Sequence, residues 1–431
     1  MQALITQLPY PDRGDAVSSN SCDTPAKTAS IRIVQSVHAK FHHFDLARQL
    51  HRHGLLEAIF TGYPRWKLKD EHLPPDKIKT FPWLRTLIMA KGRFGIRNRW
   101  FDGELNWWAA VLLDAYVASR LPQCDVFVAL SGGGLTTAGL VKKRGGRYIC
   151  DRGSTHIRFA ERILKEEFER WGPPFPKIDA RSIAREEREY DAADVITVPS
   201  KFCVHSFVEM GVAPEKIRKI VYGVDLSRFR KVADPSPDRF DVLFVGQVSF
   251  RKGVPYLLEA FSGLKHPRKR LRIVGAMQPE MKAFLQNRHS ENVEFVGPLP
   301  QRDLIPLMSA SHVMVLPSIE DGLGLVLGQA MACGCPIICS TNTGGEELLS
   351  EVHREFVVPI RNPTAIRELM EKLCQDADLR ERMSEAALER VKQIAGWDDY
   401  GDRYAALCRE LATESNAPHQ NTTFANGSRF R

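Results

Sequence analysis

The stretch Pro317-Ser318-Ile319-Glu320-Asp321-Gly322-Leu323-Gly324 runs directly into Leu325-Val326-Leu327-Gly328-Gln329-Ala330-Met331. The apolar run from His312 to Leu316 comes just before it and predicts a buried strand. Its acidic residues and glycines predict a loop, and the apolar residues that follow predict a helix from Gly324 to Met331. A strand, a loop and a helix in this order are typical of an α/β fold with a parallel sheet.

The same alternation continues on both sides of this stretch and predicts a second doubly wound domain over residues 241–394. Helical spacing returns from Asn362 to about Ile394, and a further helix is predicted from Trp397 to Leu411, within the segment 395–413. The polar tail 414–431 is expected to be disordered. The other predicted strands are Asp241–Gly246, Leu271–Val274, Val293–Val296 and Pro336–Cys339, with a helix at Val254–Leu264.

The first half of the chain shows the same pattern and predicts a Rossmann-like domain over residues 30–222. A Pro- and Asp-rich linker is expected over 223–240, and residues 1–29 read as a disordered leader without the apolar core of a signal peptide. The predicted strands of this half are Ile31–Val37, Cys124–Ser131, Arg147–Asp151 and Ala193–Pro199, and the first strand is followed by a helix over Phe44–Leu50.

Composition narrows the class of protein. The chain has 431 residues, 43% of them hydrophobic and 26% charged, and no apolar run approaches the roughly 18 residues that span a bilayer. We therefore expect a cytoplasmic protein of two α/β domains. The nine cysteines show no metal-ligand spacing, so they are expected to be free thiols. The net charge of +8 favours anionic partners, among them nucleotides, acidic lipids and nucleic acids.

Residues 63–103 form a basic and aromatic insertion that we expect to be irregular. Cations and indoles together suit the surface of an anionic bilayer, where they meet headgroups and the interface. A packed helical insertion with a solvated basic face explains the same composition. The sequence leaves these two interpretations open, so peripheral contact with the inner face of the membrane stays one of two expectations.

The loop after the strand that ends at Gly246 carries Gln247, Arg251 and Lys252 just before a helix. Backbone N–H groups and the dipole at a helix N-terminus suit an anion, and the two cations add formal charge. A diphosphate fits such a loop. An exposed basic turn without a ligand is the alternative.

The loop after the strand that ends at Leu316 adds carboxylates and glycines that suit a sugar. Seven residues separate Asp321 from Gln329, so the two side chains can share one helix face two turns apart. Asp321 could equally be an ordinary helix cap. A third loop carries Gly344 and Gly345, a pair typical of an anion-accepting backbone nest.

These motifs together resemble glycosyltransferase family 4, the retaining GT-B group, over roughly Ile31 to Leu411. The resemblance implies two Rossmann-like domains that face each other across a cleft, with the C-terminal helix crossing back to the first domain. It rests on the order and spacing of Ala192–Ser200, Gly211–Ile217 with Tyr222–Asp225, Phe244–Gly253 and Asp321–Gly334.

The resemblance also implies roles for individual residues. Lys252 would hold the donor diphosphate, Asp321 would contact the sugar and Gln329 would bind the ribose. The family pattern has Glu at the last two positions, so this chain departs from it twice, although both side chains keep hydrogen-bonding capacity. The donor-binding candidates are Gly246, Gln247, Glu320, Gly322, Leu323, Gly324, Leu325, Val326, Gln329, Gly344 and Gly345.

Two further departures concern positively charged and imidazole side chains. Gln247 stands where the family commonly has a phosphate-binding Arg, and Arg251 could supply that charge instead. In the first domain, Arg152 occupies the position of a His found in many relatives, and His156 is close enough to substitute for it. The catalytic candidates are therefore Lys252, Arg251, Asp321, His156 and Arg152.

The resemblance implies metal-independent hexose transfer with retention, from a nucleoside-diphosphate sugar to a saccharide or lipid-linked saccharide, in polysaccharide or cell-envelope glycan synthesis. Protein groups would neutralise the leaving diphosphate and position both sugars. No cofactor or metal is expected, because the one Asp-x-Asp triplet, Asp376-Ala377-Asp378, lies in the helical C-terminal region. The alternatives are a GT-B epimerase or phosphorylase, a non-catalytic relative, and a basic nucleic-acid-binding protein, which lacks a recognition motif here.

Overall fold

The computed structural model describes residues 31–38, 41–93, 99–286, 291–394 and 396–416. The expected leader 1–29 and most of the expected tail 414–431 lie outside these ranges. The described residues from Ile31 to Asn416 belong to one compact unit. Among the described residues, no helix is long and apolar enough to cross a bilayer.

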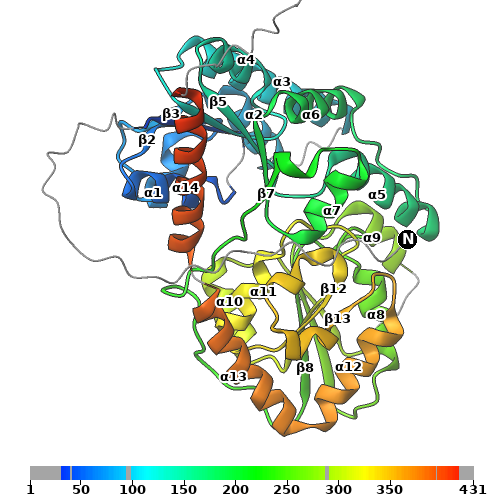
Figure 1. Ribbon diagram of the computed structural model, residues 1–431. Helices are drawn as coiled ribbons and strands as arrows, with labels where there is room; N and C mark the ends of the chain where they lie inside the picture. Colours follow the sequence, from blue (N-terminus) through cyan, green and yellow to red (C-terminus); the bar gives the residue numbers. More distant parts are fainter. Residues whose placement is uncertain (1–30, 39–40, 94–98, 287–290, 395, 417–431) are drawn as a thin grey trace, which may run out of the picture. The chain divides into compact units, whose positions relative to one another are not determined.

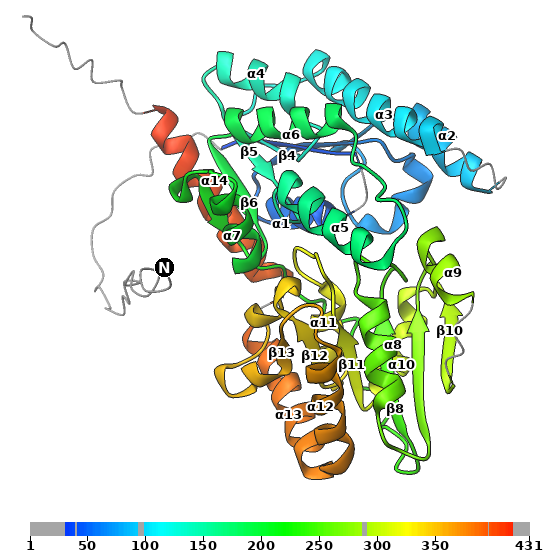
Figure 2. The ribbon, with the colours of Figure 1, turned by 90° about the vertical axis from the view of Figure 1, so that its right-hand side faces the viewer.

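The first sheet is a seven-stranded parallel sheet in the order β3-β2-β1-β4-β5-β6-β7. Every residue of β1 and β4 is buried, because helices cover both faces of a parallel sheet. Helices α3, α4 and α6 pack on one face, and α1 and α14 on the other (Figure 2). The strands are β1 (Ile33–Val37), β2 (Leu56–Thr61), β3 (Ile78–Thr80), β4 (Val126–Leu130), β5 (Arg147–Asp151), β6 (Val195–Val198) and β7 (Ile217–Lys219).

The helices of this half lie between its strands in the sequence and connect them as parallel neighbours. They are α1 (His43–Arg52), α2 (Trp83–Arg93), α3 (Arg99–Ser119), α4 (Leu135–Lys143), α5 (Ile157–Trp171), α6 (Ala180–Ala192) and α7 (Lys201–Glu209).

The second sheet lies in the lower part of Figure 1. It has six parallel strands in the order β10-β9-β8-β11-β12-β13. All six residues of its central strand β8 are buried. The strands are β8 (Phe240–Val245), β9 (Lys269–Val274), β10 (Val293–Gly297), β11 (Val313–Leu316), β12 (Ile337–Ser340) and β13 (Val357–Val358). The helices are α8 (Val254–Gly263), α9 (Pro279–Leu285), α10 (Gln301–Ser309), α11 (Leu325–Ala332), α12 (Pro363–Gln375) and α13 (Ala377–Gln393).

The order of the second sheet fixes where a ligand would bind. The strand order reverses between β8 and β11, which pair directly with each other. In doubly wound sheets, ligands bind beyond the carboxyl ends of the strands at such a switch point. The loops that follow β8 and β11 are the two loops that the sequence marked as basic and acidic.

The last helix, α14 (Trp397–Asn416), returns to the first half and packs against α1. The Gln49 side-chain amide donates to the Asp398 carboxylate at 2.8 Å. A Cβ on Gly401 would lie 2.3 Å from the Gln49 Cβ, so a glycine permits this close helix contact. The predicted two-sheet fold and the return of the C-terminal helix are both confirmed.

One prediction of local structure was wrong. Residues 63–103 are not irregular throughout, since they contain the edge strand β3, helix α2 and the start of α3. The helical segment predicted from Asn362 to about Ile394 is confirmed and consists of two helices, α12 and α13. They are separated at Asp376, whose carboxylate accepts from the Leu379 N–H at 2.7 Å and caps α13. Asp376 and Asp378 are exposed, as predicted for the Asp-x-Asp triplet.

Candidate functional site

The loops after β8 and β11 pack directly against each other. Gly253 begins α8 with a φ of 67°, and a Cβ there would lie 2.0 Å from the Pro317 carbonyl oxygen. A larger residue would therefore push the two loops apart. The close packing brings Arg251 and Lys252 of one loop next to Glu320 and Asp321 of the other.

Three ion pairs join the loops. The Lys252 ammonium donates to the Asp321 carboxylate in a short contact. The Arg251 Nε donates to Glu320 Oε2 at 2.8 Å, and its Nη2 lies 3.7 Å from Asp321 Oδ1. Lys252, Arg251, Glu320 and Asp321 thus form one four-residue charge cluster, in which two cations and two carboxylates balance.

Burial shifts pKa values within this cluster. It lowers the pKa of Lys252, while the charge of Asp321 acts in the opposite direction. Burial alone would raise the pKa of Glu320, but the charge of Arg251 and hydrogen bonds from Ser154, Arg251 and Thr155 bring that pKa down to about 2. Glu320 is therefore ionised throughout the physiological range, with its charge held by these partners.

Glu320 links the cluster to the first half of the chain. Its Oε1 accepts from the Ser154 hydroxyl at 2.5 Å and from the Thr155 hydroxyl at 2.7 Å. The backbone N–H of Thr155 donates to the same oxygen at 3.3 Å. The sequence suggested Glu320 only as a donor-binding residue, whereas the structure shows it as a bridge to the loop after β5.

Gly322 continues this contact through the backbone. A Cβ on Gly322 would lie 2.0 Å from the Gly153 carbonyl oxygen, so only glycine allows the two loops to meet. The Ser200 hydroxyl, at the start of α7, donates to the Gly322 carbonyl at 2.6 Å. The acid and glycine loop is therefore fixed by groups from the loops after β5 and β6.

The backbone donors around the cluster differ from the expectation for a helix N-terminus. At α8, the Lys252 and Gly253 N–H groups donate to the Ser249 hydroxyl and the Phe250 carbonyl, so the positive charge there comes from side chains. At α11, by contrast, no described residue accepts from the N–H groups of Leu325 and Val326. These N–H groups remain available to a ligand oxygen.

The other donor-binding candidates lie in varied surroundings. Gln329 is half-buried on α11, and its side chain has no hydrogen-bond partner among the described residues. Leu323 is buried, and Gly324 begins α11, with its N–H donating to the Thr343 carbonyl at 3.0 Å. Gln247 is exposed. A Cβ on Gly275 would lie 1.7 Å from the Gly246 carbonyl oxygen, so Gly246 packs closely against a glycine.

The Gly344-Gly345 pair serves the packing of the acid and glycine loop. Gly344 has a φ of 70°, and a Cβ on it would lie 2.9 Å from the Gly322 carbonyl oxygen. A Cβ on Gly345 would lie 2.1 Å from the Cys339 sulfur, and the Gly345 N–H donates to the Thr343 hydroxyl. These glycines allow close contact, and the Gly345 donor is already used within the loop.

Arg152 belongs to a polar network in the first half of the chain. Its guanidinium donates to the Glu186 carboxylate at 2.6 Å, to the Ser131 hydroxyl at 3.0 Å and to the Thr155 carbonyl at 2.9 Å. Burial disfavours the charged guanidinium of Arg152. Neighbouring groups, of which Glu186 has the largest effect, nevertheless raise the pKa of Arg152 above its ordinary value. Through Thr155, Arg152 also supports the loop that binds Glu320.

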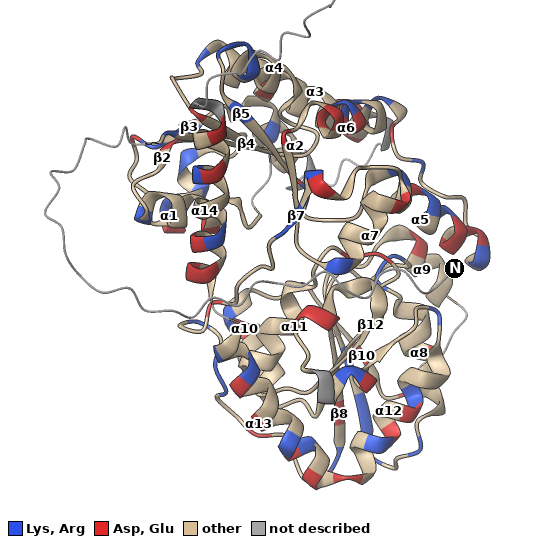
Figure 3. Cartoon of the chain, in the orientation of Figure 1, with Lys and Arg blue, Asp and Glu red and all other residues tan. Residues whose placement is uncertain are grey.

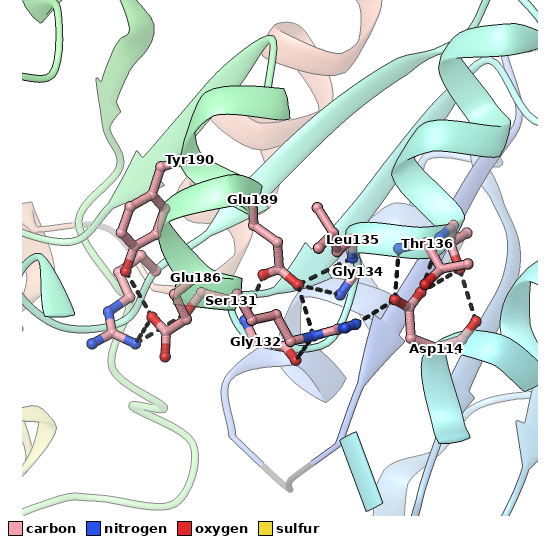
Figure 4. A network of polar contacts seen from close by, with 12 residues as sticks. Asp114, Ser131, Gly132, Gly134, Leu135, Thr136, Glu186, Glu189 and Tyr190 are labelled. Carbon is pink, nitrogen blue, oxygen red and sulfur yellow. Dashed lines mark hydrogen bonds and ion pairs between the residues drawn. The ribbon is translucent and has the colours of Figure 1, made fainter. Parts of the chain in front are cut away.

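Figure 4 shows the rest of this network, which the sequence did not reveal. Glu189 accepts from the N–H groups of Gly132, Gly134 and Leu135 and so fixes the glycine-rich loop after β4. Asp114 accepts from the Thr136 N–H at 2.7 Å. The glycine run at residues 131–134, which lies between a strand and a helix, was the one feature of the sequence that could have indicated this network.

His156 has structural contacts. Its Nδ1 accepts from the Arg158 N–H at 3.2 Å and caps α5. Its ring packs against Tyr190 and Phe207 with centroid distances of 4.9 and 5.1 Å. Burial, followed by the charge of Arg152, lowers the pKa of His156 to about 4, so the ring is neutral at physiological pH. A catalytic role for His156 remains a prediction.

A cluster of two histidines and one aspartate lies at the carboxyl end of the first sheet. The His42 and His43 Nε2 atoms lie 2.5 and 2.9 Å from one oxygen of Asp151. Among the described residues, this is the one group of three side chains with metal-ligand atoms near one another. The Thr197 hydroxyl donates to the other Asp151 oxygen at 2.7 Å. These contacts keep Asp151 ionised, since the histidines and their hydrogen bonds lower its pKa in spite of burial.

Comparison with known proteins agrees with this geometry. Residues 227–390, which contain the whole charge cluster, match the family described as Glycosyl transferases group 1. A D-inositol 3-phosphate glycosyltransferase of Streptomyces bingchenggensis is 30% identical over 52% of this chain and 54% of its own length. That alignment therefore spans about half of the relative. A D-inositol 3-phosphate glycosyltransferase of Kribbella flavida is 26% identical over 86% of this chain and 90% of its own.

A solved structure extends the likeness to the fold of both halves. Anabaena Alr3699/HepE, in complex with UDP and glucose, superposes with a TM-score of 0.65 at 16% identity. The superposition covers 88% of this chain and 100% of the HepE chain. Likeness at this level of identity concerns the fold, which is the two-sheet GT-B arrangement. Residues 227–390 are thus similar to the glycosyl transferases group 1 family, and the chain as a whole has the GT-B fold.

Proposed function

We propose that the protein transfers a hexose from a nucleoside-diphosphate sugar to a saccharide or lipid-linked saccharide acceptor, in polysaccharide or cell-envelope glycan synthesis. One observation carries the proposal. The Lys252–Asp321 and Arg251–Glu320 pairs lie at the switch point of the second sheet, where loops from both halves of the chain meet. Cations beside a sugar-binding carboxylate are what a diphosphate-sugar donor requires.

The charge cluster suggests how the donor binds. Without a ligand, Asp321 neutralises Lys252. An incoming diphosphate would take the place of Asp321 on the Lys252 ammonium and would release that carboxylate to accept hydrogen bonds from sugar hydroxyls. The free N–H groups of Leu325 and Val326 would meet further donor oxygens. Arg251 would stay bound to Glu320 and add positive potential beside the leaving group.

The transfer itself is proposed to retain the configuration at the anomeric carbon and to need no metal. Lys252 and Arg251 would supply the positive charge that stabilises the departing diphosphate. The bond from the anomeric carbon to the phosphate oxygen breaks as the acceptor oxygen attacks from the same face, and the leaving phosphate accepts the hydroxyl proton. One solved structure of similar fold supports a nucleotide-sugar donor, since HepE is described in complex with UDP-glucose.

A donor screen tests the proposal. UDP-, GDP- and ADP-sugars would be added to the protein, and the shift in melting temperature would identify the donor that binds. That donor would then be incubated with saccharide and lipid-linked saccharide acceptors, and with no acceptor. We expect transfer that depends on an acceptor and continues in the presence of a metal chelator.

Each other outcome contradicts a definite part of the proposal. Conversion of the donor without an acceptor would indicate an epimerase, and stabilisation by no donor would indicate a non-catalytic relative. Inversion at the anomeric carbon, seen in the NMR spectrum of the product, would contradict retention. Loss of activity with a chelator, restored by a divalent ion, would contradict metal independence.

A further inference from the structure

The first sheet also has a switch point. Its strand order reverses between β1 and β4, which pair directly with each other. By the rule applied to the second sheet, a ligand of the first half would lie beyond the carboxyl ends of these two strands. His38 follows β1 at this place, and the glycine run follows β4. A Cβ on Gly133 would lie 3.3 Å from His38 Nδ1, so the two loops meet.

Arg85 of helix α2 lies at the same end of the sheet. A Cβ on Gly62, in the loop after β2, would lie 3.8 Å from the Arg85 Cβ and 3.5 Å from the His38 carbonyl oxygen. Gly62 therefore packs against both Arg85 and His38. The Arg85 Nη2 donates to the Tyr63 hydroxyl at 3.4 Å, and its guanidinium carbon lies 5.3 Å from the centre of the Tyr63 ring. The ring holds the guanidinium beside the ends of β1 and β2.

The polar atoms of this group lack partners. Within the part of the chain that the structure describes, the guanidinium of Arg85 makes one hydrogen bond, to Tyr63, and no ion pair. Its Nε and the Nδ1 of His38 are both buried without a hydrogen-bond partner. A buried polar atom without a partner costs free energy, so it indicates a place for a ligand or a water molecule.

Cations elsewhere in the fold are matched by acids. Figure 3 shows both signs of charge spaced along α13 and α14. In the first half, Arg152 pairs with Glu186 at 2.6 Å and Arg185 pairs with Asp114 at 2.5 Å. Arg85 differs from these arginines, because it is half-buried and its charge is not compensated by a neighbouring carboxylate.

The charges that act most on His38 all come from basic side chains. Burial has the largest effect, and the neighbours that follow it lower the pKa of His38 to about 4; they are Arg85, His43, Arg152 and Arg185. The ring is therefore neutral at physiological pH, and the space beside Arg85 has a positive potential. Such a potential attracts an anion.

This end of the first sheet faces the donor loops. The guanidinium of Arg152 donates to the Thr155 carbonyl at 2.9 Å, and the Thr155 hydroxyl donates to Glu320 at 2.7 Å. Arg152 thus lies between His38, on which its charge acts, and the loop that contacts the charge cluster. In the proposed reaction, the acceptor approaches the donor from this side.

We propose that Arg85, with His38 beside it, binds an acidic group on the acceptor saccharide, either a carboxylate or a phosphate ester. This inference rests on the proposed transfer, because it names the class of acceptor for that reaction. The planar guanidinium can donate two parallel hydrogen bonds to either group. Arg85 takes no part in bond breaking, so its role is to select an acidic acceptor over a neutral one.

Binding of small sugars tests the inference without relying on catalysis. The 6-phosphates and the uronates of glucose, galactose and mannose, together with the three neutral sugars, would be titrated into the full chain and followed by NMR. We expect at least one acidic sugar to bind about tenfold or more tightly than its neutral counterpart, because a charged hydrogen bond is strong. The two acidic series distinguish recognition of a phosphate ester from recognition of a carboxylate.

Variants of Arg85 identify the group responsible. Arg85→Gln should lower the affinity for the acidic sugar about tenfold or more, whereas Arg85→Lys should restore part of it, because the positive charge returns. Arg120 is a matched control, since its guanidinium also lies over a tyrosine ring, that of Tyr116, at 5.2 Å and is exposed on the surface. Arg120→Gln should bind the acidic sugar as the unaltered protein does.

The transfer assay adds a readout that a general loss of structure would not give. Arg85→Gln should raise the KM for an acidic acceptor about tenfold or more and leave the KM for the donor and the melting temperature unchanged. Arg85→Gln should transfer to a neutral acceptor as the unaltered protein does, because a neutral sugar gains nothing from the charge.

Separate results overturn the inference and the proposed function. Equal binding of the acidic and neutral member of every pair, or equal binding of the acidic sugar by Arg85→Gln and the unaltered protein, would overturn the inference. An equal loss in Arg120→Gln and Arg85→Gln would overturn it as well. Binding of an acidic sugar that requires Arg85, in a protein that transfers to no acceptor, would instead contradict the proposed transfer and leave the anion site in place.

Discussion

Replacing Glu320 by Gln tests whether the contact between the two halves depends on charge. The Glu320 carboxylate is 2% exposed, and it accepts hydrogen bonds from Ser154, Thr155 and Arg251. Glutamine has nearly the same shape but leaves Arg251 without its buried counter-charge. The substitution should therefore destabilise the folded chain, by an amount that depends on pH.

The magnitude follows from the pKa of this carboxyl. It is about 2 in the folded chain, against an ordinary value of 4.5. This difference corresponds to about 3 kcal/mol of folding free energy at neutral pH. Since the folded pKa is the lower one, the stabilisation is complete above the ordinary value and is lost as pH falls towards 2. Between about pH 7 and pH 3, Glu320 should account for a loss of about 2 kcal/mol.

Urea unfolding followed by tryptophan fluorescence, at a series of pH values, measures this loss. The free energy of unfolding should fall more steeply with acid in the unaltered protein than in Glu320→Gln, and by pH 3 the difference between the two curves should have narrowed by about 2 kcal/mol. Glu355→Gln is a suitable control, because Glu355 is half-exposed and pairs with Lys372 at the surface. Parallel curves for the unaltered protein and Glu320→Gln would refute this account of the contact.

Three further substitutions test single parts of the site. Gly253→Ala should lower the free energy of unfolding by at least about 2 kcal/mol and abolish donor binding, because its Cβ would meet the Pro317 carbonyl. The control Gly172→Ala, with open space around it, should lower the free energy of unfolding by about 1 kcal/mol. Equal losses for the two variants in urea unfolding would contradict this. His156→Ala should lose about 1 kcal/mol of stability while His156→Asn keeps the α5 cap and most of the transfer rate, and a rate that collapses in a stable Asn variant would show that the imidazole takes part in the chemistry. Gln329→Glu should change donor affinity less than about threefold in calorimetry, because hydrogen bonding to ribose needs no charge, and a larger change would show that the charge matters.

The fold could be predicted from the sequence because the strands of both sheets are short apolar runs between glycines and polar loops. Arg147–Asp151 was predicted with the observed bounds, and most other strands within two residues. The insertion 63–103 was harder, because β3 has three residues and lies at the edge of its sheet. The break at Asp376 was missed since helical spacing continues on both sides of that cap.

The charge cluster was predictable only in its parts. The sequence placed Arg251, Lys252 and Asp321 after neighbouring strands, and a parallel sheet brings such loops together. It gave no sign that Glu320 would bind Ser154 and Thr155, because that contact joins residues more than 160 positions apart. The network of Glu189 and Asp114 was missed for the same reason, since buried polar contacts between distant residues leave no local pattern.

The most direct test of the central claim is the affinity of the charge cluster for the nucleoside diphosphate of the donor that the screen identifies, measured by calorimetry. Lys252→Ala should weaken this affinity at least about tenfold, because it removes a charged hydrogen bond to the diphosphate. Asp321→Asn should bind the nucleotide as tightly as the unaltered protein or more tightly, because Asp321 occupies Lys252 when no ligand is present. Equal affinity of Lys252→Ala and the unaltered protein would contradict the claim that Lys252 holds the leaving group.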